Sequence, residues 1–383
     1  MIILRLSVAL FLVQAGFHAY TAAMPLALTR VGVADASIGL VMGSAALVQI
    51  PAAIAGGRLV DAFGGGRLFA AGGLAYLAAT GVLLLPGVDV TGSLVPFVLV
   101  RVLQGVGIGL ALPAALSLVP RMVAPSRLSS SLAYVGAAQN LTLVVLPPVS
   151  IAILDATSLD GVAAAVVALV LAGMVLGQRM PVRAITTDAA ARAASRRFGI
   201  TFRREWAIPL LVLVTYVAHW GAVTAYLPAR AEAAGADIGL YFAADGLAIF
   251  LMRLPSGWLV DRFTSRLLML AGAAGTVVAV GMLLLPLTTP LLVASGLIGG
   301  GAGALVLTPI TIELSRRSSD VDRGSAFALL SGGIAVAMTL GSIGGAPIVA
   351  LFGLSAALAA GIALLLVSMA LTLSDPLLAR PGG

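Results

Sequence analysis

The chain has 383 residues, of which 60% are hydrophobic and only 10% are charged, and its formal net charge is +7. Soluble globular chains carry about 25% charged residues, so this composition excludes an ordinary soluble domain and predicts a membrane protein. Cysteine and lysine are absent, which excludes disulfides, a Walker A phosphate loop and a Schiff-base lysine, and with only two histidines we expect no zinc site.

Twelve apolar runs follow one another along the sequence, each close to the length of about 20 residues that a helix needs to cross a bilayer. The first run is too long for a signal peptide and has a counterpart in the second half, so we count it as the first helix. The runs lie near residues 4–28, 38–57, 67–86, 93–119, 129–154, 161–177, 207–227, 238–259, 266–286, 290–314, 325–350 and 354–373.

The loops between these runs alternate in charge. One set carries most of the arginines, and the other carries only Arg30 and Arg230 beside acidic residues. The positive-inside rule places the arginine-rich loops in the cytoplasm, and the even number of runs puts both termini there. The excess of arginine then sets the orientation of a multi-pass protein in the cell membrane, so we expect no nucleic-acid partner.

The two halves of the chain repeat each other. Residues 57–63 (GRLVDAF) match residues 257–263 (GWLVDRF) at an offset of 200, which shortens to 196 further along. Such self-similarity predicts two copies of one six-helix unit. An even number of helices per unit makes the copies parallel, related by an axis along the membrane normal. The predicted parts are an N-terminal bundle (1–177), a linker (178–206) and a C-terminal bundle (207–383).

The predicted linker carries seven arginines and several alanines. Two interpretations stay open for it. It is either a solvated cytoplasmic tether between the bundles, or it contains one amphipathic helix that rests on anionic lipid.

Residues 57–67 (GRLVDAFGGGR) resemble the loop signature of the major facilitator superfamily, and residues 257–266 form a degenerate copy. Glycines permit a tight reversal between helices, and the aspartate can accept bonds from helix N-termini and pair with the arginine. In that family this loop latches the cytoplasmic side in the outward-open state. The resemblance therefore implies gating roles for Gly57, Asp61, Arg67, Gly257, Asp261 and Arg266.

The resemblance covers the whole chain and is nearest to bacterial or archaeal drug- and metabolite-efflux members. It implies an all-α membrane protein with twelve transmembrane helices in two pseudo-symmetric six-helix bundles, the major facilitator fold. The fifth span departs from the family's antiporter signature, because Gly136 and Pro147-Pro148 lack its terminal glycines. The direction of transport stays open for that reason.

The fourth span contains residues 101–109 (RVLQGVGIG), which resemble a second motif found in proton-coupled members of the family. An arginine within the membrane costs about 3 kcal/mol or more on insertion scales, so we expect Arg101 to face a cavity or a partner. Its implied role is to tune a proton-carrying group or to bind an anionic substrate. Snorkelling toward the headgroups is the alternative, and the matching position in the other half, Leu297, is not basic.

In the family, the first, fourth, seventh and tenth spans line a central cavity, and each carries one group that is costly in lipid. Histidine can carry a proton near neutral pH, but a lone membrane histidine is often only hydrogen-bonded to a neighbouring helix. Asp245 is our first choice for a proton carrier, and a structural ion pair with Arg253 is the alternative. We interpret Glu313, near Arg316 and Arg317, as a gate or salt-bridge residue. The candidates for substrate binding or proton coupling are Asp245, Arg101, His18, His219, Arg253, Gln14, Gln104, Tyr216 and Tyr226, and Gln49, Gln139 and Asn140 can also reach the cavity.

The predicted function is secondary active transport, with no enzymatic activity and no cofactor. Proton-coupled efflux of small organic or amphiphilic compounds by alternating access is the first hypothesis. Proton-coupled uptake of an organic anion or another metabolite is the alternative, because Arg101 and Arg253 could pair with a carboxylate. A receptor would not need both gating loops, and two inequivalent halves offer no symmetric ring of channel selectivity residues. The expected partners are a small-molecule substrate, protons and membrane lipid, and we expect a monomer.

Overall fold

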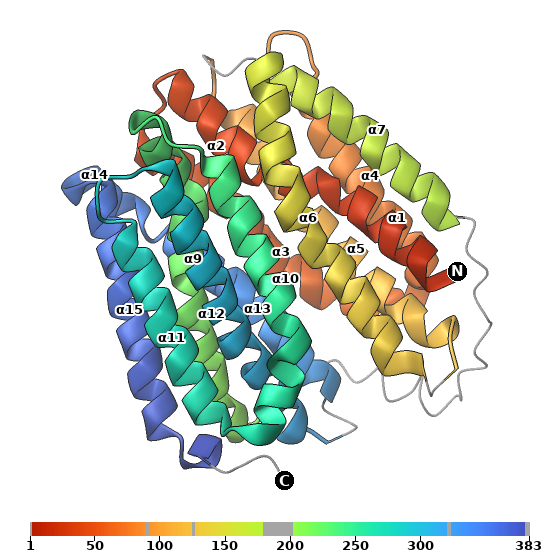
Figure 1. Ribbon diagram of the computed structural model, residues 1–383. Helices are drawn as coiled ribbons and strands as arrows, with labels where there is room; N and C mark the ends of the chain where they lie inside the picture. The colour runs from red at the N-terminus through yellow and green to blue at the C-terminus, as the bar shows by residue number, and fades with distance from the viewer. Residues whose placement is uncertain (1, 89–91, 125–126, 179–201, 320–322, 380–383) are drawn as a thin grey trace.

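The computed structural model describes residues 2–88, 92–124, 127–178, 202–319 and 323–379, and the regular structure in these ranges is entirely helical. Eleven of the described helical spans are long and apolar enough to cross a membrane. A twelfth, α10 (Ile238–Arg262), is 25 residues long and packs among them (Figure 1). The predicted all-α fold of twelve transmembrane helices in two six-helix bundles is therefore confirmed.

The helices of each half follow in chain order. The first half contains α1 (Ile2–His18), α2 (Tyr20–Arg30), α3 (Asp35–Phe63), α4 (Gly65–Leu83), α5 (Val95–Leu118), α6 (Leu128–Ala156) and α7 (Leu159–Gln178). The second half contains α9 (Ala207–Ala233), α10, α11 (Ser265–Met282), α12 (Thr289–Arg316), α13 (Arg323–Ser342), α14 (Ala346–Phe352) and α15 (Leu354–Ser374). α1 and α2 together form one span that is interrupted at Ala19, and α13 and α14 form another.

The second and eighth spans extend beyond the ends that hydropathy predicts. Because α3 continues to Phe63 and α10 to Arg262, the two motif glycines Gly57 and Gly257 lie within helices. The reversal between α3 and α4 occurs at Gly64 instead, with a positive φ of 84° that favours glycine. The first glycine of each motif therefore continues a helix, and a later glycine of the 57–67 motif makes the reversal that was expected there.

Most of the predicted linker, residues 179–201, lies outside the described residues, and so does the question of an amphipathic helix there. The described part begins again before a short 3₁₀ turn (Arg204–Trp206), which leads directly into α9. Trp206 is fully buried, and its indole Nε1 donates a hydrogen bond to the Arg317 carbonyl. The end of the linker is thereby fixed to the second half.

Glycines allow close approach of helices within each half. An added Cβ at Gly105 of α5 would lie 2.3 Å from the Ala45 carbonyl oxygen of α3. One at Gly300 of α12 would lie 2.1 Å from the Asp245 carbonyl oxygen of α10. Small residues let backbones touch, which favours helix association in a bilayer where lipid is as apolar as the side chains. The backbone around Asp245 is therefore held tightly against α12.

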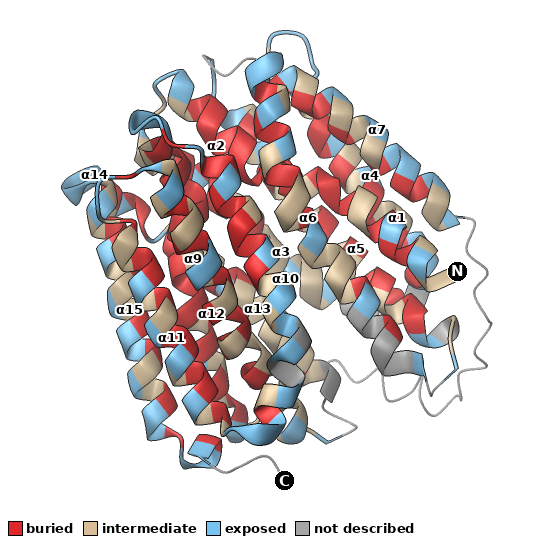
Figure 2. Cartoon of the chain, in the orientation of Figure 1, coloured by how far each residue is buried: buried red, intermediate tan, exposed pale blue. Residues whose placement is uncertain are grey.

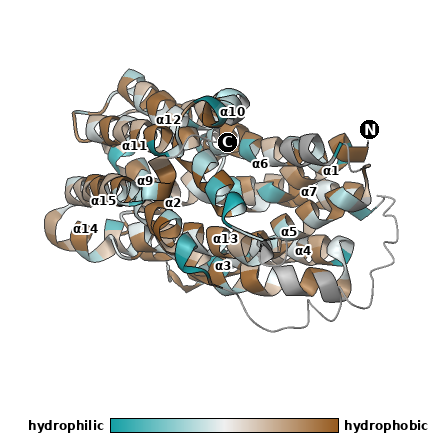
Figure 3. Ribbon diagram, turned by 90° about the horizontal axis from the view of Figure 1, so that it is seen from below, coloured by the Kyte–Doolittle hydropathy of each residue, from teal (hydrophilic) through white to brown (hydrophobic). Residues whose placement is uncertain are grey.

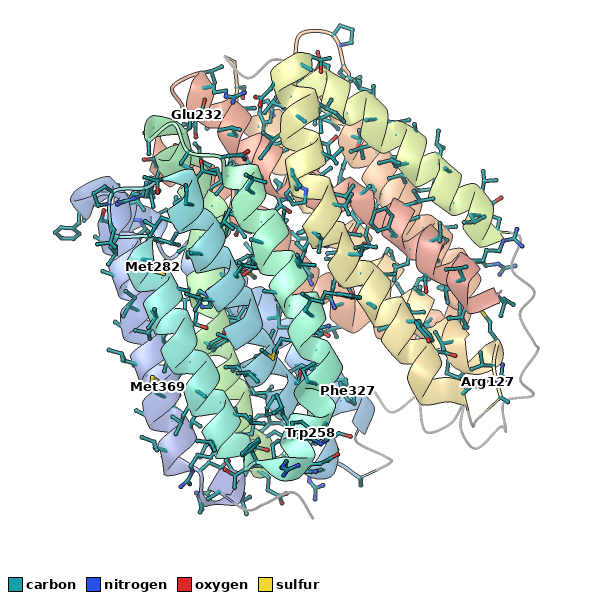
Figure 4. The ribbon with its side chains drawn as sticks, in the orientation of Figure 1. Arg127, Glu232, Trp258, Met282, Phe327 and Met369 are labelled. Carbon is teal, nitrogen blue, oxygen red and sulfur yellow. The ribbon has the colours of Figure 1, made fainter. Side chains whose placement is uncertain are left out.

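The two halves meet near one face of the molecule and diverge toward the other. We call the face that carries the linker ends the linker face, and the face at the end of α2 the opposite face. α6 and α10 lie close near the opposite face, at the top of Figure 1, and separate downward. Figure 4 shows Glu232 near the opposite face, and Arg127 and Trp258 near the linker face on different halves. Seen from the linker face, α3 and α13 lie side by side between the two groups of helices (Figure 3).

Apolar side chains cover much of the outward helix surface. Large hydrophobic residues such as Leu4, Val95 and Leu366 are exposed. Figure 2 shows that buried residues follow the inward faces of the helices, while exposed residues follow the outward faces. Together with the lengths of the spans, this arrangement identifies a multi-pass membrane protein.

Candidate functional site

A cavity of about 330 Å³ lies between the two halves. Helices α1, α2, α3, α5 and α6 form its first-half wall, and helices α9 to α13 form its second-half wall. The predicted candidates that line it are His18, Arg101, Tyr216, His219, Asp245 and Arg253, and Gln49, Gln139 and Asn140 also line it. A site built from both halves can change its exposure when the halves move relative to each other.

The cavity is reached from the linker face. Arg253 and Ser331 line it and are exposed, whereas Thr21 and Thr224, nearer the opposite face, line it and are buried. The divergence of α6 and α10 toward the linker face agrees with this difference (Figure 1). The structure is therefore open on one side and closed on the other.

On the opposite face, one arginine connects the two halves. Arg30, at the end of α2, places Nε 2.8 Å from Glu232 Oε1 in the second half. Its Nη1 lies 2.6 Å from Asp155 Oδ1 in its own half. All three side chains are partly exposed, so each pair contributes about 1 kcal/mol or less. The pairs nevertheless lie where the halves must separate if this face is to open.

Two equivalent glycines also lie at contacts between the halves. An added Cβ at Gly39 of α3 would lie 2.0 Å from the Tyr226 hydroxyl oxygen of α9. One at Gly239 of α10 would lie 3.1 Å from Pro148 Cα of α6. Tyr226 donates a hydrogen bond to the Ser342 carbonyl, which holds its ring in place against Gly39. Both copies of the repeated Ile-Gly-Leu sequence therefore help to close the opposite face.

Arg101 is a buried cation on the first-half wall, with 4% of its surface exposed. Its Nη1 donates to Gln104 Oε1 at 2.7 Å, and its Nη2 donates to the Met42 carbonyl at 3.2 Å. The guanidinium carbon lies 4.9 Å from the centre of the Phe17 ring. None of the described carboxylates forms an ion pair with Arg101, and its Nε has no described acceptor. The cavity thus has a fixed positive charge on this wall.

His18 and Thr21 lie on the same wall and lack hydrogen-bond partners among the described residues. Both ring nitrogens of His18 and the hydroxyl oxygen of Thr21 form no hydrogen bond there, although both side chains are buried. The His18 ring meets the edge of Phe17 at 5.2 Å between centroids, which places it beside the Arg101 group. Buried polar atoms are usually paired, so this unpaired cluster is unusual for a packed interior.

Asp245 provides a carboxylate on the second-half wall, with 4% of its surface exposed. No described side chain within ion-pair distance neutralises it, so the alternative of a structural pair with Arg253 is not what the structure shows. An added Cβ at Gly299 of α12 would lie 3.8 Å from Asp245 Oδ1, so the glycine leaves room for the carboxylate. Carboxylates inside a membrane are costly and commonly serve transport.

The other histidine of the cavity has a defined tautomer. His219 Nδ1 donates to the Tyr216 carbonyl, which leaves Nε2 as the acceptor of the neutral ring. The Tyr216 hydroxyl lies 2.7 Å from Thr276 Oγ1, and the Thr276 hydroxyl donates to the Gly272 carbonyl at 3.0 Å. Because the threonine proton is used there, Tyr216 is the donor of this pair. These bonds hold both rings along the cavity wall.

Three of the predicted site residues lie outside the cavity lining. Gln104 accepts from Arg101, Gln14 accepts from the Tyr76 hydroxyl at 2.8 Å, and Tyr226 lies at the contact between the halves. Gln14 thus contacts α4, whereas His18 and Thr21, further along the same span, line the cavity. Direct substrate contact is therefore not expected for Gln14, Gln104 and Tyr226.

An aromatic wall of the cavity was not predicted from the sequence. Trp220 of α9 and Tyr241 of α10 both line it and stack with ring centroids 6.4 Å apart. Trp220 follows His219 directly, but the pattern of one helix does not show that a second helix brings Tyr241 beside it. These rings offer a flat apolar surface near Asp245.

The predicted gating residues lie at the linker face, and the contacts that Glu313 and Arg266 form among the described residues are with their own half. Glu313 Oε1 accepts from the Ser265 hydroxyl at 2.7 Å, and its other oxygen lies 3.3 Å from Arg317. Arg317 also lies 2.7 Å from Asp375 Oδ2, so the cluster joins α11, α12 and the C-terminal segment. Glu313 is therefore a buried salt-bridge residue of the second half and does not line the cavity.

The expected pairing of Arg266 with Asp261 is wrong in this state. Arg266 Nη2 donates to the Asp375 carbonyl at 2.6 Å, and Asp261 is exposed without an ion pair among the described residues. The reason is that Arg266 follows the turn into α11 and points toward the C-terminal segment. Gly57 and Asp61 lie in the last turns of α3, and Arg67 is exposed in the first turn of α4.

Comparisons with known proteins agree with this architecture. The sequence matches the family model of the Major Facilitator Superfamily over residues 6–237 and 210–382. A search of curated proteins gave no match. Among solved structures, a peptide transporter in complex with alafosfalin has a TM-score of 0.76 at 17% identity, covering 99% of this chain and 95% of the other.

Two further structures are similar over nearly the whole chain. A D-xylose-proton symporter has a TM-score of 0.74 at 17% identity and covers 96% of both chains. The human organic anion transporter MFSD10 (TETRAN) has a TM-score of 0.70 at 16% identity, covering 97% of this chain and 98% of the other. At these identities the likeness shows a shared fold.

Proposed function

The chain belongs to the Major Facilitator Superfamily, and on that premise we propose that it is a proton-coupled secondary transporter that exports small amphiphilic organic compounds. The observation that carries the proposal is Asp245, a carboxylate without an ion-pair partner among the described residues in a cavity between two halves. Movement of the halves would expose this group to each side of the membrane in turn. A group that binds a proton on one side and releases it on the other couples transport to the proton gradient.

The gradient supplies enough free energy for uphill transport. Moving one proton through 100 mV provides about 2.3 kcal/mol, which supports a concentration ratio of roughly 50 for the substrate. The similarity to a D-xylose-proton symporter supports proton coupling in this fold, although that protein carries out symport. Export is the direction we propose, and uptake of an organic anion is the alternative that Arg101 favours.

The linker face is the cytoplasmic side in this proposal. It carries the arginine-rich loops, which the positive-inside rule assigns to the cytoplasm together with both termini. The structure then corresponds to an inward-open state, with a cavity that receives compounds from the cytoplasm. Asp261 is unpaired in the described chain, which is consistent with a cytoplasmic latch that forms only after the linker face closes.

The gating roles follow from the same cycle. We assign the latch to Gly57, Asp61, Arg67, Gly257, Asp261 and Arg266, at the linker-face ends of α3, α4, α10 and α11. Closing this side would bring the ends of α3 and α10 toward the other half. Arg30, Gly39 and Gly239 would form the corresponding gate of the opposite face.

Proton flux in liposomes tests the proposal. The purified protein is reconstituted with a pH-sensitive dye inside, and amphiphilic compounds are added one at a time. We expect proton movement that depends on the compound for the wild type and none for Asp245→Asn, which should still exchange labelled compound down its gradient. Asp160→Asn removes an exposed carboxylate outside the cavity and serves as the control. Coupled proton flux by Asp245→Asn would refute the role of this residue.

A further inference from the structure

The first-half wall of the cavity has a buried positive charge without a carboxylate partner among the described residues. Arg317, which has a side chain only 8% exposed, shows how this chain otherwise neutralises a buried arginine, because it pairs with both Glu313 and Asp375. Arg101 is buried to a similar degree, and among the described residues it contacts only the Gln104 side-chain oxygen, the Met42 carbonyl and the Phe17 ring in this way. An uncompensated buried charge is strongly unfavourable, so a ligand that supplies the negative charge would stabilise the wall.

The atoms around this charge form a site for an anion. Arg101 Nε, both ring nitrogens of His18 and the Thr21 hydroxyl have no described partner, and His18, Thr21 and Arg101 all line the cavity. Three side chains that line one wall, from α1, α2 and α5, therefore carry buried polar atoms that the described residues leave unsatisfied. Gln104, Met42 and Phe17 hold the guanidinium from its other sides, so its planar donors are fixed before a ligand binds.

The remaining wall suits an apolar body. Trp220 and Tyr241 stack across the cavity lining of the second half, and Phe17 lies beneath the guanidinium. A cavity of about 330 Å³ is at the lower end of the range for small-molecule sites. It therefore fits a compact molecule with one charged end and one aromatic or aliphatic end.

We propose that the transported compound is an amphiphilic organic anion whose carboxylate binds at Arg101, His18 and Thr21. The apolar part lies against Trp220 and Tyr241, while Asp245 on the facing wall carries the coupled proton. This inference rests on the proposed transport function and names the substrate class of the same cavity. The two charges are assigned to different halves of the molecule: the anion binds to the first half, and the proton binds to the second.

Three compounds with the same apolar body test the anion site: 4-phenylbutyrate, its amide and 4-phenylbutylamine. Their effect on the thermal stability of the purified full chain in detergent gives an apparent affinity for each. We expect the carboxylate to bind more tightly than the amide, and the amine not to bind. Arg101→Gln should weaken carboxylate binding by roughly 10- to 100-fold, because a charge-assisted hydrogen bond is lost. Arg101→Lys should be intermediate, since an ammonium group lacks the planar fork.

Two further variants keep the test independent of any folding defect in Arg101→Gln. Thr21→Val has nearly the same shape and should weaken carboxylate binding by about fivefold, because one hydroxyl is lost. Arg5→Gln removes a half-buried arginine at the beginning of α1, outside the cavity lining, and should leave the affinity unchanged. Asp160→Asn removes an exposed carboxylate outside the cavity lining and should likewise leave the affinity unchanged.

Several outcomes would overturn the anion site. These are a carboxylate preference that survives Arg101→Gln, tighter binding of the amine, an equal response to all three compounds, or an equal loss of binding in Arg5→Gln. The proton-flux assay separates this failure from a failure of transport. If the wild type binds the carboxylate but moves no protons with any compound, the transport mechanism fails and the anion site stands. If a neutral compound drives proton flux in Arg101→Gln, transport stands and the anion site fails.

Discussion

Arg30 and Arg230 occupy equivalent places in the two halves, at the same offset of 200 residues that relates the repeated motifs, yet they have different partners. Arg30 reaches across to Glu232 of the other half. Arg230 donates to the Ser355 hydroxyl and to the Leu284 carbonyl, both in its own half. One copy therefore closes the opposite face of the molecule, and the other copy stabilises a single bundle.

The cavity walls differ in the same way. Asp245 of α10 has Ala45 as its counterpart on α3, and Arg101 of α5 has Leu297 as its counterpart on α12. Leu297 is 45% exposed and lies on the helix surface, whereas Arg101 lines the cavity. Duplication thus provides the same backbone frame twice, and single side-chain differences give the walls different chemistry. Three comparisons test this specialisation, and two of them are between equivalent positions.

The largest difference is expected at the linker face. Glu313 has Ser117 as its counterpart, whose hydroxyl donates only to the Ala114 carbonyl of its own helix. Glu313→Gln leaves Arg317 with a weaker partner in a buried cluster, so we expect the free energy of unfolding to fall by about 3 kcal/mol. Ser117→Ala should lower it by less than about 1 kcal/mol. Thermal and denaturant unfolding of the purified variants measures both values.

Equal effects of the two substitutions would contradict this asymmetry. A useful control is Arg316→Gln, because the Arg316 side chain is 38% exposed and lies 3.7 Å from Glu313. Such a partly exposed pair contributes about 1 kcal/mol or less. A loss in Arg316→Gln as large as that in Glu313→Gln would mean that the buried pair with Arg317 is not the main contribution.

The contact between the halves gives the next largest effect. A leucine at position 39 would clash with the Tyr226 hydroxyl, which its hydrogen bond to the Ser342 carbonyl holds in place. Gly39→Leu should therefore displace the Tyr226 ring. We expect the free energy of closing the opposite face to become less favourable by about 2 kcal/mol, which corresponds to roughly a 30-fold shift in the equilibrium between states. Since the chain contains no cysteine, labelling of a Thr224→Cys variant with a membrane-impermeant reagent from the opposite face reports this opening.

Gly81→Leu is the matched control for this substitution. Gly81 of α4 has no heavy atom within 4 Å of an added Cβ, apart from its own helix backbone. Labelling of Thr224→Cys should be unchanged in that background. Unchanged labelling in the Gly39→Leu background as well would show that this glycine does not limit closure.

The smallest effect is expected for the two equivalent arginines. Arg30→Ala removes the partly exposed ion pairs with Glu232 and Asp155, of which the first joins the halves. We therefore expect the free energy of closing the opposite face to become less favourable by about 1 kcal/mol. This change corresponds to about fivefold faster labelling of Thr224→Cys. High salt should reduce the difference, because partly exposed charges are screened.

Arg230→Ala provides the comparison for Arg30→Ala. It should lower thermal stability slightly and leave the labelling rate of Thr224→Cys unchanged, since its partners lie within the second half. If Arg230→Ala opened the opposite face as much as Arg30→Ala, the two copies would not be specialised. The salt dependence should also be confined to the Arg30 position.

The sequence by itself determined the membrane class, the number of spans, the duplication and the superfamily. Each of these depends on local properties, namely the length of apolar runs, the charge of short loops and the spacing of motif residues. The sequence also identified the ionisable groups that later line the cavity, because charges are rare in apolar spans and are costly there. The end of α3 was predicted too early, at residue 57 and not at Phe63, since one glycine does not end a helix, whereas the end predicted for α10 is close to the observed one.

Only the tertiary structure decided which polar groups face the cavity, which have partners and which side is open. Gln14 and His18 lie one turn apart on α1, yet Tyr76 of α4 binds Gln14, while His18 lines the cavity. Arg30 and Glu232 are 202 residues apart and meet only because the halves close at the opposite face. Such contacts depend on how distant helices pack and on the state of the two bundles, and neither is a property of any single span.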